Sequence, residues 1–221
     1  MVTFSTTTQR QIVMLIDFRE LFPKYDINPK GVLHIGANKG EEAPVYLELG
    51  ITKQIWIEAN PEIYIDLKET LRNNPDALAY NYAIGDVDAV PTILHVSNNG
   101  SQSSSILELG THKEQHPDVH YIKDIPITMR RIDCLIPEMV IKEYDFLNID
   151  VQGFEGQVLQ GIGDYLKYFK WAYLEVNKAQ VYQGCWEVPK IDRYLFDLGF
   201  ERVETKWVGN WGDALYIKHK P

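Results

Sequence analysis

Two glycines frame a short segment between an apolar run and a helical one. The run Val32–Ile35 is followed by Gly36 and Gly40, and the stretch Glu41–Leu49 has helical periodicity. Glycine lets a backbone approach a ligand closely, and in a doubly wound sheet the ligand lies beyond the carboxyl ends of the strands. Strand, tight loop and helix in this order therefore predict a ligand-binding loop.

A carboxylate, Glu58, ends the next apolar run, Gln54–Glu58. At the tip of a second strand it could accept hydrogen bonds from two ribose hydroxyls, which indicates an adenosine-type cofactor. The glycine spacing is G-x-x-x-G rather than the G-x-G-x-x-G of dinucleotide sites, and the loop has no Lys followed by Ser or Thr to hold phosphates. Both features weaken the dinucleotide and ATP interpretations.

Apolar runs that could position these groups alternate with helical stretches. A helix start is expected at Asn60-Pro61, and further helices are expected after Gly153 and after Pro189. Further strand-like runs cover residues 78–84, 92–96, 125–132, 144–149 and 171–176. The alternation predicts an α/β fold with a mostly parallel, doubly wound sheet that is covered on both faces.

The two ends of the chain depart from this alternation. Residues 12–22 have helical spacing before Pro23, and we expect a helical cap over residues 1–30 in front of a single domain over residues 31–221. The runs 200–208 and 214–219 predict an antiparallel hairpin that closes the sheet. Between the strands, the polar segment 97–124 is long enough to form a functional loop or lid.

Charge and composition disfavour several classes of partner. The 221 residues include 22 basic and 31 acidic side chains, a net charge of -9, which would repel nucleic acid and anionic membrane surfaces. Cys134 and Cys185 lie far apart, and the apolar run near the amino terminus is too short for a membrane span or a signal core. We therefore expect a cytoplasmic protein without nucleic acid or membrane partners, and the sequence indicates no oligomeric state.

Several motifs, in order along the chain, resemble one known family. They are Val32–Gly40, Trp56–Pro61, Asn81–Asp86, Ser103–Leu107, Phe146–Glu155 and Trp211–Tyr216. Together they resemble the FkbM family of S-adenosylmethionine-dependent O-methyltransferases, and the segment Asp150–Glu155 is the most specific of them. The resemblance implies a class I methyltransferase (Rossmann-like) fold, S-adenosylmethionine as cofactor, and a hydroxyl of a small molecule, first of all a sugar or glycan, as acceptor.

The resemblance also implies a set of cofactor-binding residues. They are Gly36, Ala37, Asn38, Gly40, Glu58, Asn60, Ile84, Ser104 and Asp150. One position differs: many members carry an acidic residue at the end of the first strand, where this chain has His34. A histidine buried at the strand end is the more ordinary interpretation of that position.

Methyl transfer to a hydroxyl needs a base or a metal ion near the acceptor. Asp150 follows the run 144–149, and Glu175 and Asn177 end the next strand, so the three should converge. As a set they resemble the divalent-metal site of catechol-type O-methyltransferases and would suit Mg²⁺ or Mn²⁺. In the alternative interpretation, Asp150 and Glu155 orient loops and cofactor, and Glu175 is the base.

Histidines and aromatic residues offer further candidates. His112, His116 and His120 recur at i, i+4 and i+8, but Pro117 argues against one unbroken helix that would align them. His112 is the candidate general base on a loop that would bind the acceptor. The more ordinary interpretation is that all three are solvated loop histidines without a catalytic role. A wall for a sugar ring could be formed by Tyr182, Cys185, Trp186 and Trp211.

Two other functions stay open on the sequence. An NAD-dependent oxidoreductase would share the fold class, although the glycine spacing counts against it. A catalytically silent cofactor-binding module would keep the loop and Glu58 without turnover. Hydride transfer would identify the first, and equal affinity for the methyl donor and its demethylated product, without any acceptor, would identify the second.

Overall fold

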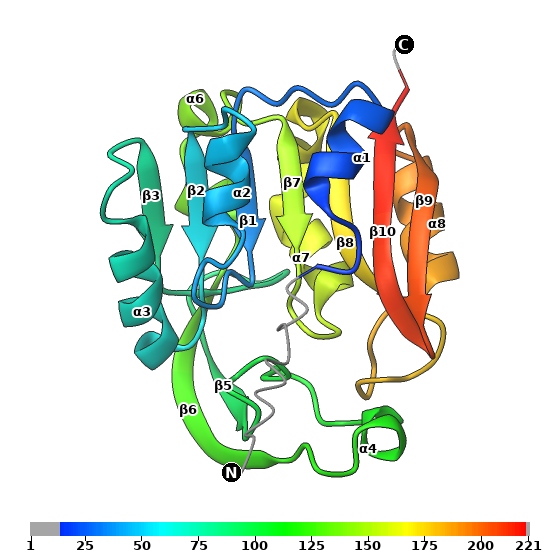
Figure 1. Cartoon of the computed structure of the whole chain (residues 1–221). Helices are drawn as coiled ribbons and strands as arrows, with labels where there is room; N and C mark the ends of the chain where they lie inside the picture. The colour runs from blue at the N-terminus through cyan, green and yellow to red at the C-terminus, as the bar shows by residue number, and fades with distance from the viewer. Residues whose placement is uncertain (1–13, 220–221) are drawn as a thin grey trace, which may run out of the picture.

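A seven-stranded sheet forms the centre of the protein in the computed structural model, which describes residues 14–219 (Figure 1). In spatial order its strands are β3 (Ala77–Tyr80), β2 (Gln54–Ile57), β1 (Val32–Ile35), β7 (Phe146–Ile149), β8 (Trp171–Asn177), β10 (Trp211–Lys218) and β9 (Phe200–Val208). Within this sheet β10 alone runs opposite to the other six strands, so its pairings with β8 and β9 are antiparallel and the remaining pairings are parallel. The predicted α/β class, mostly parallel sheet and closing hairpin are confirmed.

Helices cover both faces of the sheet. One face carries α1 (Phe18–Lys24), α2 (Ala43–Glu48) and α3 (Pro61–Leu71), and the other carries α5 (Ile132–Leu135), α6 (Glu138–Ile141), α7 (Glu155–Ile162), the 3-10 helix η1 (Gly163–Tyr168) and α8 (Val188–Phe196). Neighbouring strand residues enter opposite cores: Val32 packs on the α1 and α2 side, and Leu33 on the α7 and α8 side. Every residue of β1, β2 and β7 is buried, as expected for parallel strands covered on both faces.

A second, three-stranded sheet extends from the carboxyl ends of the main strands (Figure 1). Its order is β4 (Ala83–Ile84), β6 (Tyr121–Arg130) and β5 (Val90–Ser97), and α4 (His112–Gln115) lies in the connection between β5 and β6. The prediction of one strand over 78–84 is therefore wrong. The chain changes sheets after β3, where Asn81 Nδ2 donates to the carbonyls of Glu58 (2.8 Å) and Ala59 (3.1 Å).

Helix α1 begins later than the sequence predicted. Asp17 Oδ1 accepts the backbone N–H of Arg19 at 2.9 Å, which caps a helix that starts at Phe18 and runs through Pro23 instead of ending before it. Because Pro23 lies near the end of a short helix, its missing N–H removes only one hydrogen bond. The start of the expected helix lies outside the described residues, and the domain boundary at residue 30 stays a prediction.

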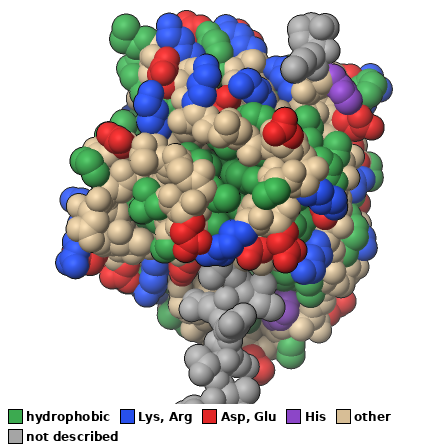
Figure 2. Space-filling model, turned by 45° about the horizontal axis from the view of Figure 1, so that its top comes forward, with side chains coloured by type: hydrophobic (Ala, Val, Ile, Leu, Met, Phe, Trp, Pro, Cys, Tyr) green, Lys and Arg blue, Asp and Glu red, His purple; other side chains and the backbone are tan. Residues whose placement is uncertain are grey.

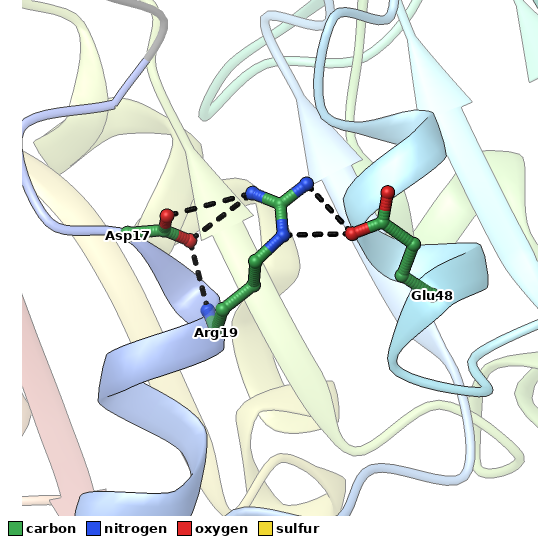
Figure 3. Close-up of polar contacts among 3 residues, drawn as sticks. All are labelled: Asp17, Arg19 and Glu48. Atoms are coloured by element: carbon green, nitrogen blue, oxygen red, sulfur yellow. Dashed lines mark hydrogen bonds and ion pairs between the residues drawn. The ribbon is translucent and has the colours of Figure 1, made fainter.

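Arg19 connects α1 to α2 (Figure 3). Its Nε and Nη2 each lie 2.7 Å from Glu48 Oε2, and its Nη1 lies 3.3 Å from Asp17 Oδ1. These groups are exposed, so the ion pair stabilises α1 less than burial of its apolar side does. That side is anchored by Phe18, whose ring packs against Phe22, Tyr46, Phe146 and Tyr173. Helix α1 is a packing element of the sheet.

The outer surface carries both signs of charge. Figure 2 shows Lys and Arg side chains interspersed with Asp and Glu across one face of the molecule. This mixed distribution differs from that of the interior cavity described below. Between residues 14 and 219, no helix is long and apolar enough to cross a bilayer.

Candidate active site

A cavity of about 980 Å³ opens at the carboxyl ends of β1, β2, β7 and β8. At this edge the chain order reverses, because β2 lies on one side of β1 and β7 on the other. The loops after these strands line the cavity together with parts of the segment 99–119. A doubly wound sheet binds its ligand at this switch point, and the volume suits a ligand of cofactor size.

Gly36 shapes the cavity through its contact with β7. It has φ +85°, and a Cβ placed there would lie 1.7 Å from the carbonyl oxygen of Asp150. No L side chain fits at that distance, so the glycine is required by the backbone even before a ligand binds. The sequence predicted a glycine here for ligand approach; the structure adds that the β1 and β7 loops touch at this residue.

Glu58 joins the loops after β1 and β2. Its Oε2 accepts the backbone N–H of Asn38 at 2.8 Å, and its Oε1 accepts that of Asn60 at 2.6 Å. Burial raises the pKa of this carboxyl to about 7, although both hydrogen bonds act in the opposite direction. Because each oxygen retains a lone pair, the carboxylate can still accept bonds from a ligand.

Asn60 links this corner to the segment that follows β5. Its Oδ1 accepts the backbone N–H of Glu62 and caps α3, while its Nδ2 donates to Ser101 Oγ at 3.0 Å. Ser101 Oγ in turn lies 2.7 Å from Ser104 Oγ, and Ser104 Oγ accepts the N–H of Ser97. The serine-rich segment is thus fastened to the cavity rim through side-chain hydrogen bonds.

Most of the predicted cofactor-binding residues line the cavity. Those that do are Gly36, Ala37, Asn38, Glu58, Ile84, Ser104 and Asp150. Gly40 and Asn60 do not line it and act on the shape of the loops instead. A Cβ on Gly40, at φ +76°, would lie 2.9 Å from a methyl group of Leu67 in α3, so this glycine permits helix packing. The role of each residue in cofactor binding stays a prediction.

Asp150 and Glu175 both accept a hydrogen bond from the side-chain amide of Gln152. Gln152 Nε2 donates to Asp150 Oδ1 at 2.5 Å and to Glu175 Oε2 at 2.9 Å, while its Oε1 accepts the hydroxyl of Tyr182 at 2.5 Å. Burial, and next the charge of Asp213, raise the pKa of Asp150 to about 7. Burial and the neighbouring Asp150 also raise the pKa of Glu175. The two form a desolvated carboxyl pair that can hold a proton near neutral pH.

The trio predicted to bind a metal does not come together. Asn177 does not line the cavity, and neither its Oδ1 nor its Nδ2 has a hydrogen-bond partner. The reason is strand length: Ile149 at the end of β7 pairs with Leu174, so Asn177 lies well beyond that edge, opposite Trp211. Across residues 14–219, no group of three or more His, Cys, Asp or Glu is arranged to hold a metal ion. The residues present therefore do not fit Mg²⁺ or Mn²⁺ as predicted.

His112 lies on the cavity wall as an uncharged side chain. Its Nε2 is 3.2 Å from Ser103 Oγ, and its buried Nδ1 has no partner. Burial, and next the charge of His116, lower the pKa of His112 to about 4. His116 also lines the cavity, whereas His120 does not, so the three histidines share no common face.

His34 occupies the end of β1 as a buried, stacked ring. It is 2% exposed, and its ring stacks on Trp56 with 4.7 Å between centroids. Its Nδ1 lies 3.3 Å from the Tyr46 hydroxyl, and burial lowers its pKa to about 3. His34 is therefore a neutral ring at the end of β1, and it lines the cavity.

Sequence reasoning missed several contributors to the cavity. It assigned no role to Gln152, although this residue lies inside the specific motif Asp150–Glu155, or to Asp213, which lies inside the closing motif. Of the aromatic wall, Tyr182 and Trp211 line the cavity, but Cys185 and Trp186 do not. Their neighbourhood depends on loop paths that the sequence pattern does not show.

Glu155 has the loop-orienting geometry of the alternative interpretation. It is fully buried, and its Oε1 accepts the backbone N–H groups of Val151 (3.2 Å) and Gly153 (3.0 Å). Gly153 has φ +97°, and a Cβ there would lie 2.7 Å from Tyr182. These contacts fix the turn after β7 that presents Asp150 and Gln152 to the cavity.

The strand order and the site together define a class of protein. Parallel strands in the order β3-β2-β1-β7-β8, closed by the hairpin of β10 and β9, with a glycine loop after β1 and a carboxylate after β2, make up a class I methyltransferase. The chain belongs to the Methyltransferase FkbM domain family, whose sequence model matches residues 34–202. It is an S-adenosylmethionine-dependent methyltransferase, and the oxidoreductase alternative is not favoured.

Known proteins of this kind are similar over most of the chain. The chain is 27% identical over 222 residues to 2-O-methyltransferase NoeI of Sinorhizobium fredii (strain NBRC 101917 / NGR234). This aligned region covers 96% of this chain and 86% of that protein. Among solved structures, magnesium protoporphyrin IX methyltransferase of Synechocystis PCC 6803 with bound SAM has a TM-score of 0.46 and 11% identity, over 85% of this chain and 69% of that chain. Ribosomal protein L11 methylase of Lactobacillus delbrueckii subsp. bulgaricus has a TM-score of 0.45 and 14% identity, over 86% and 70%.

Proposed function

We propose that the protein transfers a methyl group from S-adenosylmethionine to a hydroxyl of a sugar or glycan. The observation that carries this proposal is the carboxyl pair Asp150 and Glu175, held by Gln152 beside the loop after β1. A hydroxyl acceptor needs such a proton acceptor. The similarity to a 2-O-methyltransferase and the motifs of the resembling family support an oxygen acceptor on a sugar.

The residues at the ends of β1 and β2 fit the methyl donor. S-adenosylmethionine supplies an electrophilic methyl group on a sulfonium. Glu58, held by two backbone N–H groups, has acceptor capacity left for the ribose hydroxyls. The Oδ1 of Asn38 is buried without a partner, and Ile84 and Ser104 line the same cavity. Glu58 would therefore orient the donor, and Asn38 would offer one more acceptor.

The carboxyl pair would take the proton of the acceptor. Asp150 or Glu175 would accept the hydroxyl proton, and the acceptor oxygen would then take the methyl group that the bound donor supplies from its sulfonium. A base with a pKa of about 7, as at Asp150, accepts a proton and returns it to water at neutral pH. Gln152 and Tyr182 keep the pair in place.

Transfer of an isotopically labelled methyl group tests the proposal. The protein is incubated with a labelled donor and a glycan mixture, and mass spectrometry locates the label. We expect a labelled O-methyl ether with the wild-type chain and with Asp66→Asn, which changes an exposed carboxylate outside the cavity. Asp150→Asn should give almost none. Donor binding without methylation of any glycan would contradict the proposal.

The same assay separates the base from a metal ion. Because the predicted metal trio does not converge, we expect activity to survive a chelator. Activity that EDTA abolishes and Mg²⁺ or Mn²⁺ restores would instead support a metal ligated by Asp150 and Glu175. A pH profile that follows a single group near neutral pH supports the carboxyl pair.

A further inference from the structure

The cavity wall has a strongly one-sided charge. Six carboxyl side chains line it, and no Lys or Arg does so among the residues that the structure describes: Glu41, Glu42, Glu58, Asp150, Glu175 and Asp213. The chain has 22 basic residues, and Figure 2 shows Lys and Arg side chains interspersed with acids on one outer face. Over residues 14–219, the absence of Lys and Arg is thus a property of the cavity wall rather than of the composition.

Three lysines near the rim do not line the cavity. Lys39, in the loop after β1, pairs with Asp66 at 3.0 Å, and Lys123 pairs with Glu62 at 2.5 Å. Lys206, opposite Asp213 in the register of β9 and β10, is exposed and does not line the cavity. Lys39 and Lys123 are thus paired with acids outside the cavity, whereas Lys206 acts from outside the wall on Asp213, whose pKa its charge lowers.

Asp213 shows that the acids are fixed parts of the wall. Its Oδ2 accepts the backbone N–H of Leu15 at 2.9 Å and the hydroxyl of Tyr173 at 2.7 Å. Burial raises the pKa of Asp213, and its charge in turn raises those of Asp150 and Glu175. The carboxyl groups therefore act on one another across the cavity. Among the residues that the structure describes, no Lys or Arg on the wall would compensate the charge of an anion that entered.

The methyl donor offsets only part of this charge. Its sulfonium and ammonium groups exceed its carboxylate by one positive charge. Six carboxyl groups face it, and because burial raises the pKa of five of them, only part of the six is ionised at neutral pH. The wall also carries uncharged polar groups, among them His112, whose Nδ1 lacks a partner, and Tyr182. Such groups suit hydroxyls, and Trp211 on the same wall offers an apolar surface for a ring.

We propose that the acceptor is a sugar without an anionic group near the methylated hydroxyl, that is, a neutral or amine-bearing glycoside, and that the cavity rejects phosphorylated, uronic and nucleotide-linked sugars. This inference rests on the proposed function and narrows its substrate class. A free or lipid-linked glycan fits this description, whereas a nucleoside diphosphate sugar does not. The methyl group is then added after the sugar has left its activated carrier.

A matched set of acceptors tests the proposal. Methyl glycosides of glucose, galactose and mannose are compared with their 6-amino, uronate and 6-phosphate forms, and the nucleoside diphosphate esters of the same three sugars are added, all with labelled donor. We expect methylation of the neutral and amine forms. For the anionic forms we expect kcat/KM to be lower by a factor of at least about 100. Anionic forms methylated as fast as neutral ones would overturn this inference and leave O-methyl transfer to sugars intact. If no sugar is methylated, both proposals fail.

Variants of the wall show whether the carboxyl charge causes the selectivity. Glu41→Gln and Asp213→Asn each remove one acid, and either should reduce the preference for neutral over phosphorylated acceptors about tenfold. Asp197→Asn, which changes an exposed acid outside the cavity that pairs with Arg193, should leave the ratio unchanged. Because Asp213 also holds Leu15 and Tyr173, Glu41→Gln decides the question if Asp213→Asn does not fold. An unchanged ratio in a folded Glu41→Gln protein would contradict the charge argument.

Discussion

The two parts of the cavity are built by different means. Where β1 and β2 end, every contact involves the backbone. Gly36 lies against the carbonyl of Asp150, and the backbone N–H groups of Asn38 and Asn60 donate to the Glu58 carboxylate. Where β7 and β8 end, side chains bond to side chains, from Tyr182 through Gln152 to two acids. The first part should therefore control folding and donor binding, and the second should control turnover.

Substitution of Gly36 should produce the largest effect. In Gly36→Val the new Cβ would overlap the Asp150 carbonyl, and the residue would keep a left-handed φ of +85°. We expect a loss of stability of about 3 kcal/mol or more, with donor binding abolished. Thermal unfolding and calorimetry measure both effects.

Gly50 provides the matched control for that substitution. It has φ +79°, but nothing lies within 4 Å of a Cβ placed there, so Gly50→Val carries the backbone strain without the collision. We expect a loss of only about 1 kcal/mol and normal donor binding. Equal losses in the two variants would show that contact between the β1 and β7 loops is unimportant.

Asp150→Asn should affect turnover much more than binding. The amide is nearly isosteric but cannot accept the proton, so kcat should fall by about 10²- to 10⁴-fold while the donor Kd changes little. Kinetics with an acceptor that the wild type methylates give kcat, and calorimetry with the donor gives its Kd. A variant with wild-type turnover would move the proton acceptor to Glu175 or to His112.

Glu58→Ala should affect binding and leave the carboxyl pair alone. Loss of hydrogen bonds to a charged group should weaken donor binding by about 1.5 to 3 kcal/mol. Glu58→Gln keeps the side-chain length and one acceptor oxygen, so its loss should be smaller. Donor affinity unchanged in folded Glu58→Ala would remove this residue from the cofactor site, and kcat at saturating donor should stay close to that of the wild type.

The same difference explains what the sequence could predict. Gly36 and Glu58 lie directly after apolar runs, and parallel strands bring such ends to one edge whatever the rest of the fold does. The order of elements, the parallel sheet and the closing hairpin follow from the same local patterns. Burial of His34 as a neutral ring also agrees with its position inside a fully buried strand.

The other part depends on distances along strands that the sequence does not fix. The sequence pattern predicts Asn177 in the site because it cannot show that β8 continues three residues past Leu174, the partner of the last residue of β7. The crossing of the chain between β3 and β4 depends on Asn81 side-chain bonds, and the link from Tyr182 to Gln152 joins loops far apart in sequence. Contacts of this kind are tertiary, and no periodicity indicates them.

The smallest expected effect is a dependence of donor binding on pH through Glu58. Its pKa of about 7 in the ligand-free protein lies above the ordinary value, so the group holds a proton at pH 6 and loses it by pH 8. The ionised form accepts ribose hydroxyls and attracts a cationic donor, so the donor favours it and lowers the pKa on binding. Affinity should therefore rise about tenfold from pH 6 to pH 8 and level off above, with protons released at pH 6.

Calorimetry in two buffers of different ionisation enthalpy measures that release directly. Glu58→Gln has no proton to lose at this position, so it should show less release and a flatter profile than the wild type. The part that remains should come from Asp150, whose pKa is also about 7, and should disappear in Glu58→Gln combined with Asp150→Asn. If the wild-type profile is flat and no protons are released, the ends of β1 and β2 bind the donor through backbone geometry alone, and the charge of Glu58 has no part in it.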